Sequence, residues 1–253
     1  MATARPAFAD QQYDVRGDDA YRVGSPAMVS RVEYAGTQRL SVERHGHHTR
    51  YDAQASYVRD AGDGKTRLHA RFVQEILPNG SFEDRFDEDP DFLTILNQPF
   101  AIQLDAVTIR DLRGLRHAVP FDATSPLGGD AVLRGYLRPG TAGAIAGRAA
   151  TAVRFEADGP MTAPMPARTN ATISGRMRMD GTAYYSLDDA MLLALDATLT
   201  IVAQLHEGSK TTPVRIVYRR FIRATAPAGR STPRTPRPTP LPTGAGTVSP
   251  ATP

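Results

Sequence analysis

The chain has 253 residues, no cysteine, no tryptophan and a formal net charge of +3. This length fits one large domain or two small ones, and it is sufficient to bury a core without cross-links. The absence of cysteine excludes disulfides, thiolate metal sites and a cysteine nucleophile. Residues 226–253 carry three arginines and no acid, which accounts for the whole net charge. The neutral body argues against a nucleic-acid groove.

The two ends of the chain differ in composition from the body. Residues 1–12 are expected to be a flexible N-terminus, in which Ala7-Phe8-Ala9 has the small-x-small form of a signal-peptide cleavage site. Residues 226–253 contain 8 of the 20 prolines and are expected to be a disordered Pro/Thr/Arg-rich tail. The sequence therefore predicts a single β-rich domain over residues 13–225 and an extracytoplasmic location, periplasmic or secreted.

The body alternates apolar and polar residues with a period of two, which is typical of strands with one buried face. The runs that show it, in chain order, are residues 50–59, 65–77, 100–105, 153–158, 173–183, 190–205 and 213–224. Turn signals separate several of them: Ala61–Gly64, Pro78–Ser81, Tyr185–Asp189 and Glu207–Lys210. Such sequential connections predict an antiparallel meander.

The strongest run is 190–205, where Met191, Leu193, Leu195 and five further apolar residues occupy one face without a miss. Ser186 and Asp189 also resemble a capping box that would start a helix there. The unbroken period of two favours a strand over that helix.

Two short helices are expected between the strands. Asp89-Pro90-Asp91 has the residues of a helix start and is followed by apolar residues as far as Asn97. Thr108 with Asp111 forms a second capping box, with Leu112 facing inward and Gly114 as the stop. Since long antiparallel strands twist and coil, the sequence predicts a mainly β fold: a large curved antiparallel meander sheet, half-barrel or barrel, with one to three short helices.

Candidate chemical motifs in the sequence are incomplete. Gly64-Lys65-Thr66 lacks the upstream glycine of a phosphate-binding loop, and the acids around Asp87 lack the glycine and glutamate of a calcium loop. His45, His47 and His48 could hold a metal ion and support a metal-dependent enzyme, although Gly46 at a hairpin tip would break that geometry. The segment His117–Asp130 is expected to be a crossing loop or a lid.

The body as a whole resembles the bacterial extracytoplasmic half-barrels of the lipoprotein-carrier type (LolA/LolB-like). The resemblance is carried by the long meandering strands, the short apolar helices between them and the export-like terminus, and no short motif carries it. It implies a curved sheet that holds an acyl chain or another apolar ligand.

These observations predict a non-enzymatic extracytoplasmic binding protein that holds an apolar or lipid-like ligand and needs no cofactor. The residues expected to line the ligand are Phe72, Ile76, Phe92, Leu96, Met177, Met179, Met191 and Leu193. The alternative is a structural or interaction module of the cell envelope, with a filled core and a Pro-rich stalk that contacts an envelope protein. No run approaches the roughly 18 apolar residues of a membrane helix, so no membrane span is expected.

Overall fold

The computed structural model describes residues 7–45, 48–76, 82–87, 106–124, 132–164 and 170–225. These residues form one antiparallel sheet of eleven strands and one helix. The elements are β1 (Ala7–Val23), β2 (Met28–His45), β3 (His48–Asp60), β4 (Lys65–Ile76), β5 (Phe82–Asp87), α2 (Ala106–Gly114), β6 (Val119–Thr124), β7 (Val132–Ile145), β8 (Arg148–Pro164), β9 (Ala171–Ser186), β10 (Leu192–Glu207) and β11 (Lys210–Ala224).

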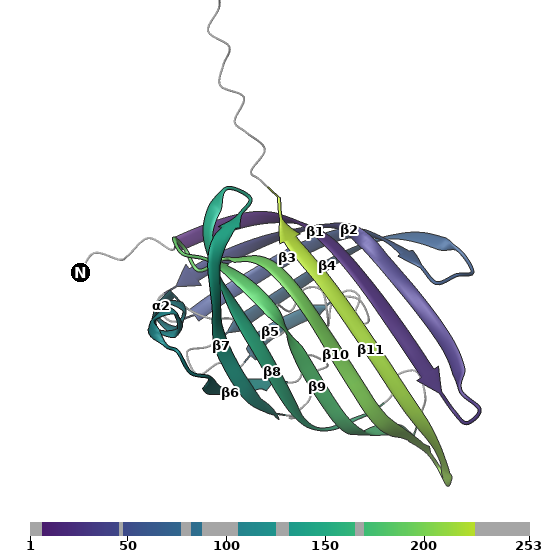
Figure 1. Ribbon diagram of the computed structural model, residues 1–253. Helices are drawn as coiled ribbons and strands as arrows, with labels where there is room; N and C mark the ends of the chain where they lie inside the picture. Colours follow the sequence, from purple (N-terminus) through teal and green to yellow (C-terminus); the bar gives the residue numbers. More distant parts are fainter. Residues whose placement is uncertain are drawn as a thin grey trace, which may run out of the picture.

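The strand order is β5-β4-β3-β2-β1-β11-β10-β9-β8-β7-β6 (Figure 1). Two sequential meanders, β1–β5 and β6–β11, are therefore joined side by side through the first and last strands. The β1–β11 ladder runs from Tyr13 opposite Ala224 to Val23 opposite Val214. The two edge strands, β5 and β6, do not pair with each other, so the sheet stays open. The predicted curved antiparallel meander is confirmed, and it is a half-barrel type of sheet rather than a closed barrel.

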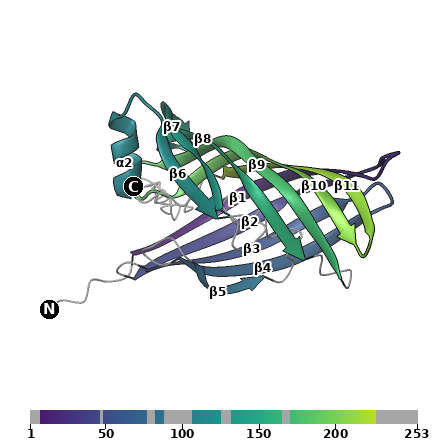
Figure 2. The same ribbon diagram turned by 90° about the horizontal axis from the view of Figure 1, so that it is seen from below.

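The sheet folds over, so that β1–β5 lie opposite β6–β9 (Figure 2). Glycines allow neighbouring strands to approach closely at two places in the sheet. A Cβ at Gly36 would lie 2.2 Å from the Ser56 carbonyl oxygen and 2.5 Å from the Tyr57 Cα. A Cβ at Gly135 would lie 1.8 Å from the Glu156 carbonyl oxygen. Because backbone atoms block both places, only glycine fits there without a shift of the strands.

One face of the sheet, called the inner face here, carries the core. On β10 the inner residues Leu193, Leu195, Leu199 and Ile201 are at most 4% exposed, while Val202 on the outer face is 57% exposed. The same alternation runs along the other long strands, and the buried apolar side chains form one continuous cluster. The strand prediction for residues 190–205 is therefore confirmed against the helix alternative.

The predicted turns connect the strands as expected. Ala61–Gly64 joins β3 to β4, and β10 returns as β11 at Gly208, which has a φ of +59°. β4 and β5 also pair antiparallel, and the turn expected between them at Pro78–Ser81 lies outside the described residues. Each of these strand pairs is sequential, as expected of a meander.

Three sequence expectations need correction. β1 begins at Ala7 rather than near residue 13, and Ala7–Ala9 pair with β2, so the cleavage-like motif belongs to the sheet. Within the segment His117–Asp130, expected to be a crossing loop or a lid, Val119–Thr124 form β6 and pair with β7, and residues 125–130 lie outside the described residues. Helix α2 begins at Ala106, ahead of the expected cap at Thr108, although it ends at Gly114 and buries Leu112 as predicted.

Other expectations lie outside the described residues. These are the helix expected at residues 89–97, the strand expected at 100–105 and the tail at 226–253.

The close approach at Gly36 can be tested by unfolding in urea. Gly36→Ala forces a methyl group against the β3 backbone, and we expect it to lower the free energy of unfolding by about 1–3 kcal/mol. Gly143→Ala is the matched control, since a Cβ at Gly143 meets nothing within 4 Å. It should change stability by less than about 0.5 kcal/mol. Equal effects of the two substitutions on the free energy of unfolding would show that the close approach at Gly36 does not require glycine.

Candidate ligand-binding site

Three polar side chains on the inner face hold atoms without a hydrogen-bond partner among the described residues. The atoms are Gln38 Oε1, Gln74 Nε2 and the Nε and Nη2 of Arg220. All three side chains are at most 4% exposed. A buried polar group without a partner costs about 1–3 kcal/mol, and native structures contain few of them. Their position on a single face marks the interior of the folded sheet as the candidate site.

Arg220 is the most unusual of these residues, because it is a fully buried charge in the middle of the sheet. Its guanidinium pairs with the carboxylate of Asp19, and both side chains are 0% exposed. The pair joins β1 to β11, since Arg220 lies opposite Gly17 and Asp19 lies opposite Tyr218 in the ladder. Arg220 Nη1 donates to Asp19 and, at 2.8 Å, to the Arg219 carbonyl oxygen.

Aromatic rings flank the Arg220 guanidinium. Its Cζ lies 5.3 Å from the ring centroid of Tyr34 and 5.6 Å from that of Tyr218, which are cation–π distances. Tyr21 meets Tyr218 edge to face, with ring centroids 6.0 Å apart. We refer to Asp19, Tyr21, Tyr34, Tyr218 and Arg220 as the Arg220 cluster.

A glycine makes room for this arginine. A Cβ at Gly17 would lie 3.0 Å from Arg220 Nη1 and 3.2 Å from its Cδ and Cζ. The arginine side chain therefore lies across β1 on the inner face, in the space that a larger residue at position 17 would fill.

Burial controls the titration of the cluster. Desolvation raises the pKa of Asp19, and the Arg220 guanidinium with hydrogen bonds from Tyr34 and Tyr21 opposes that rise. Desolvation likewise raises the pKa of Tyr21 and of Tyr34, so both phenols stay protonated and able to donate. The Tyr21 hydroxyl lies 3.3 Å from Asp19 Oδ2.

The apolar residues expected to line a ligand fall into two groups. Met177 and Met179 are 0% exposed and lie opposite Ile201 and Leu199 on β10, close to the Arg220 cluster. Met179, Leu199 and Tyr218 occupy one inner row across three strands. Soft methionine side chains at such a place adapt to ligands of variable shape.

The second group lies at the other end of β10. Met191 is 3% and Leu193 0% exposed, near Tyr185 at the end of β9. The structure therefore does not bring these two residues to Met177 and Met179. Phe72 is 1% exposed on β4. Ile76 is in β4, but its side chain is not described, and Phe92 and Leu96 lie outside the described residues.

A polar network fixes this second end of the sheet. Arg148 on β8 donates to Gln11 on β1 at 3.2 Å and to Ser186 on β9 at 2.9 Å, and it forms an ion pair with Asp189. β1 and β8 are not neighbours in the strand order, so these bonds hold two distant parts of the folded sheet together.

The side chains of the histidine motif lie outside the described part of the structure. Among the residues that the structure does describe, no three His, Cys, Asp or Glu side chains come together as potential metal ligands. His45 and His48 face each other at the ends of β2 and β3, but their side chains are not described, and His47 lies outside the described residues.

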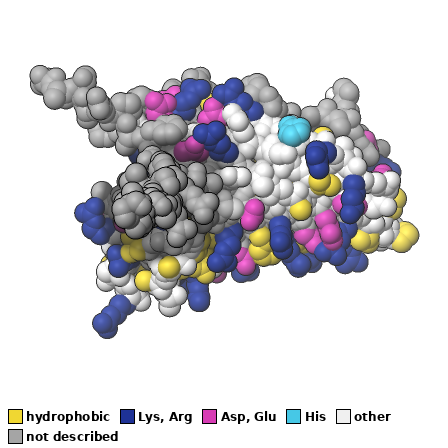
Figure 3. Space-filling model, turned by 90° about the horizontal axis from the view of Figure 1, so that it is seen from above, with side chains coloured by type: hydrophobic (Ala, Val, Ile, Leu, Met, Phe, Trp, Pro, Cys, Tyr) yellow, Lys and Arg dark blue, Asp and Glu magenta, His cyan; other side chains and the backbone are white. Residues whose placement is uncertain are grey.

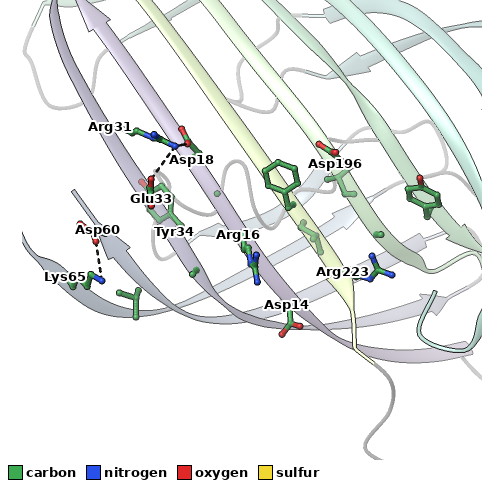
Figure 4. Close-up of a pocket in the computed structure, with 18 residues that line it drawn as sticks. Asp14, Arg16, Asp18, Arg31, Glu33, Tyr34, Asp60, Lys65, Asp196 and Arg223 are labelled. Carbon is green, nitrogen blue, oxygen red and sulfur yellow. Dashed lines mark hydrogen bonds and ion pairs between the residues drawn. The ribbon is translucent and has the colours of Figure 1, made fainter. Parts of the chain in front are cut away.

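Shallow grooves cross the outer face. One, of about 930 Å³, is lined by residues of β1–β4 and β9–β11 with charges of both signs (Figure 4). Arg31 pairs with Asp18 and Glu33, and Lys65 pairs with Asp60. A second groove, of about 730 Å³, lies over β7–β11 and is similarly mixed. Acidic and basic side chains also alternate over the visible surface in Figure 3. Neither groove selects one ligand charge.

Sequence reasoning missed Asp19 and Arg220, although a signal for both is present. Arg220 falls in phase with Ile216, Tyr218 and Ile222, and Asp19 falls in phase with Tyr13 and Tyr21. A charged residue on the apolar phase of a long strand indicates a buried polar site.

No protein-family model, no curated protein and no solved structure matches this chain. In the described part of the chain, no helix has both the length and the apolar character needed to cross a membrane.

The buried ion pair can be tested by a double-mutant comparison. Asp19→Ala leaves Arg220 buried and uncompensated, and we expect a loss of about 3–5 kcal/mol in the free energy of unfolding. The double variant Asp19→Leu/Arg220→Met removes both charges and should recover most of that loss. Urea denaturation followed by circular dichroism measures both. A double variant as unstable as Asp19→Ala would contradict the pairing.

The network around Asp189 predicts a pH-dependent contribution to stability. Partial burial alone would raise the pKa of Asp189, but the Met191 amide, the Ser186 hydroxyl and Arg148 together hold that pKa below its usual value. The contribution is therefore present above about pH 4, the unfolded pKa, and is lost as the pH falls through the folded pKa.

Asp189→Asn should accordingly lower the free energy of unfolding at pH 7 by up to about 1 kcal/mol, because the side chain is 38% exposed and solvent screens its interactions. The difference from wild type should shrink below pH 4. Asp188→Asn, at the neighbouring exposed position, is the control and should change stability by less than about 0.5 kcal/mol. A loss at Asp189 that is equal at pH 7 and pH 3 would contradict the assignment.

Proposed function

We propose that the protein is a non-enzymatic binding protein that holds an apolar or lipid-like ligand on the inner face of its folded sheet. The observation that carries the proposal is the set of buried, unpartnered polar atoms of Gln38, Gln74 and Arg220 on an otherwise apolar face. A guest with an apolar body and a few hydrogen-bonding groups would complete these side chains.

The open sheet supports the same proposal. Among the described strands, β5 and β6 are unpaired with each other, so their hydrogen bonds do not close the sheet on that side. Apolar side chains from both meanders, including Phe72 and Met179, face this interior. Ligand sites are concave and mostly apolar, with a small number of polar groups that fix orientation.

The proposal includes an extracytoplasmic location, which only the sequence pattern supports. Because Ala7–Ala9 lie within β1, a processing site would have to lie before the sheet begins.

The alternative function is a structural module of the cell envelope with a filled core. The continuous cluster of buried apolar side chains favours it, since cores of this kind are common in proteins without a ligand. The two proposals differ in whether the interior accepts a guest.

Native mass spectrometry of the purified full chain, followed by solvent extraction of any released molecule, separates the two proposals. A binding protein should carry a lipid-like molecule of defined mass, whereas a filled module gives the mass of the chain alone.

Binding of the neutral apolar dye N-phenylnaphthylamine to lipid-stripped protein gives a second test. The dye should fluoresce in the wild type. Met179→Gln places an amide on the inner face next to Leu199, and we expect it to weaken dye binding about tenfold. Val202→Gln, on the outer face of β10, is the matched control and should leave binding unchanged. A wild type that neither carries a lipid nor binds the dye would refute the proposed function.

A further inference from the structure

We infer that Arg220 is the anchor for the carboxylate of a long-chain fatty-acid-type ligand, whose acyl chain lies over the methionines of β9. The inference rests on the proposed function and names the ligand class for that site. The structural observation behind it is the pair of unpartnered donors on a fully buried guanidinium.

The two free donors have the geometry of a carboxylate receptor. Among the described residues, Arg220 donates only through Nη1, to Asp19 and to the Arg219 carbonyl oxygen. The Nε–H and one Nη2–H of an arginine lie parallel along one edge of the planar guanidinium. Such a fork fits both oxygens of a carboxylate at once. A single carbonyl or hydroxyl oxygen would leave one of the two donors unmatched.

The surroundings of Arg220 favour binding at this edge rather than over its faces. Tyr34 and Tyr218 lie within cation–π distance of the guanidinium. Because position 17 has no Cβ, the Arg220 side chain can lie across β1 and reach Asp19. The arginine is thus held in place before a ligand arrives, which reduces the entropy lost on binding.

The charges of the cluster accommodate a second carboxylate. Asp19 already receives hydrogen bonds from Arg220, Tyr21 and Tyr34, which disperse its negative charge. Two carboxylates on one guanidinium share a proton more readily than isolated ones. The charged and titratable groups of the cluster are Asp19, Tyr21, Tyr34, Tyr218 and Arg220, from β1, β2 and β11.

Apolar side chains lie next to the anchor on the inner face. In the strand register, Arg220 lies beside Ala197 and then Gly181, where a Cβ would lie 2.7 Å from the Phe155 ring. The adjacent inner row runs through Leu199 to Met179. Met179 is two strand spacings from β11, about 10 Å, which an extended acyl chain that displaces the packing of this row would span. The outer grooves offer no comparable apolar surface, because charges of both signs line them.

The test uses the lipid-stripped full chain loaded with N-phenylnaphthylamine, which has no carboxylate. Hexadecanoate should displace the dye at a concentration about tenfold lower than hexadecanol, because only the acid fills both donors of the fork. Acetate should not displace the dye at the same concentrations, since it lacks the acyl chain.

Two variants assign the preference to Arg220. Arg220→Lys keeps the charge beside Asp19 but lacks the fork, so the preference for the acid over the alcohol, measured relative to the variant's own dye affinity, should fall about tenfold. The double variant Asp19→Leu/Arg220→Met removes both buried charges and should likewise lose the preference for the acid over the alcohol. Arg219→Lys, on the outer face of β11, is the control and should keep the wild-type preference.

The outcomes distinguish failure of the fatty-acid inference from failure of the proposed binding function. Equal displacement by acid and alcohol in the wild type, or an unchanged preference in both Arg220 variants, would overturn the fatty-acid inference while leaving an apolar site. Displacement by acetate would reduce the site to a small-anion site and overturn the acyl part. Failure of the dye to bind at all refutes the proposed function itself.

If neither Arg220 variant folds, the wild type still decides the question. The carboxyl-carbon NMR signal of labelled hexadecanoate should move on binding and lose the titration seen in free solution, because a guanidinium-bound carboxylate is withdrawn from water. A bound signal that titrates like the free acid would overturn the inference.

Discussion

The pairing of the first strand with the last is the constraint on which the rest of the structure depends. Without the β1–β11 ladder the chain would form two separate meanders, each with one apolar face exposed to water. With this ladder, a single sheet of eleven strands can fold over, so that the apolar faces of the two meanders bury each other in a common interior. The hydrophobic effect supplies the driving force, since burial of apolar area is the dominant favourable contribution to folding. The ladder joins residues some 200 positions apart, so it depends on correct register between distant parts of the chain.

The Asp19–Arg220 pair lies across this ladder and helps to specify its register. A slip of one residue would turn Arg220 to the outer face and leave Asp19 alone in the interior, which costs several kcal/mol. The same pair leaves one edge of the arginine unmatched. The residue that helps to align the two meanders is therefore also the residue that we propose as the anchor of a ligand.

The two faces of the sheet divide the chemistry of the molecule. On the outer face, acids and arginines pair across neighbouring strands, as Arg71 does with Asp52 and Arg138 with Glu156, and such exposed pairs contribute little to stability. On the inner face, polar groups are few, buried and in part unmatched. Polar groups in a low-dielectric interior interact strongly and specifically, which is the physical reason to look for selectivity there rather than in the outer grooves.

The sequence by itself determined the class of fold and much of the inner face. The period-two runs at 173–183 and 190–205 predicted β9 and β10 with the correct faces, and the turn residues predicted sequential antiparallel neighbours. The strands β1 and β2 were missed because buried polar residues such as Asp19 and Gln38 interrupt their apolar alternation. Only the tertiary structure decided that β1 pairs with β11, that the edges stay apart, and that Asp19 meets Arg220. These features depend on contacts between residues distant in sequence, and hydrophobic periodicity reports only which face a residue occupies, not which residue lies beside it.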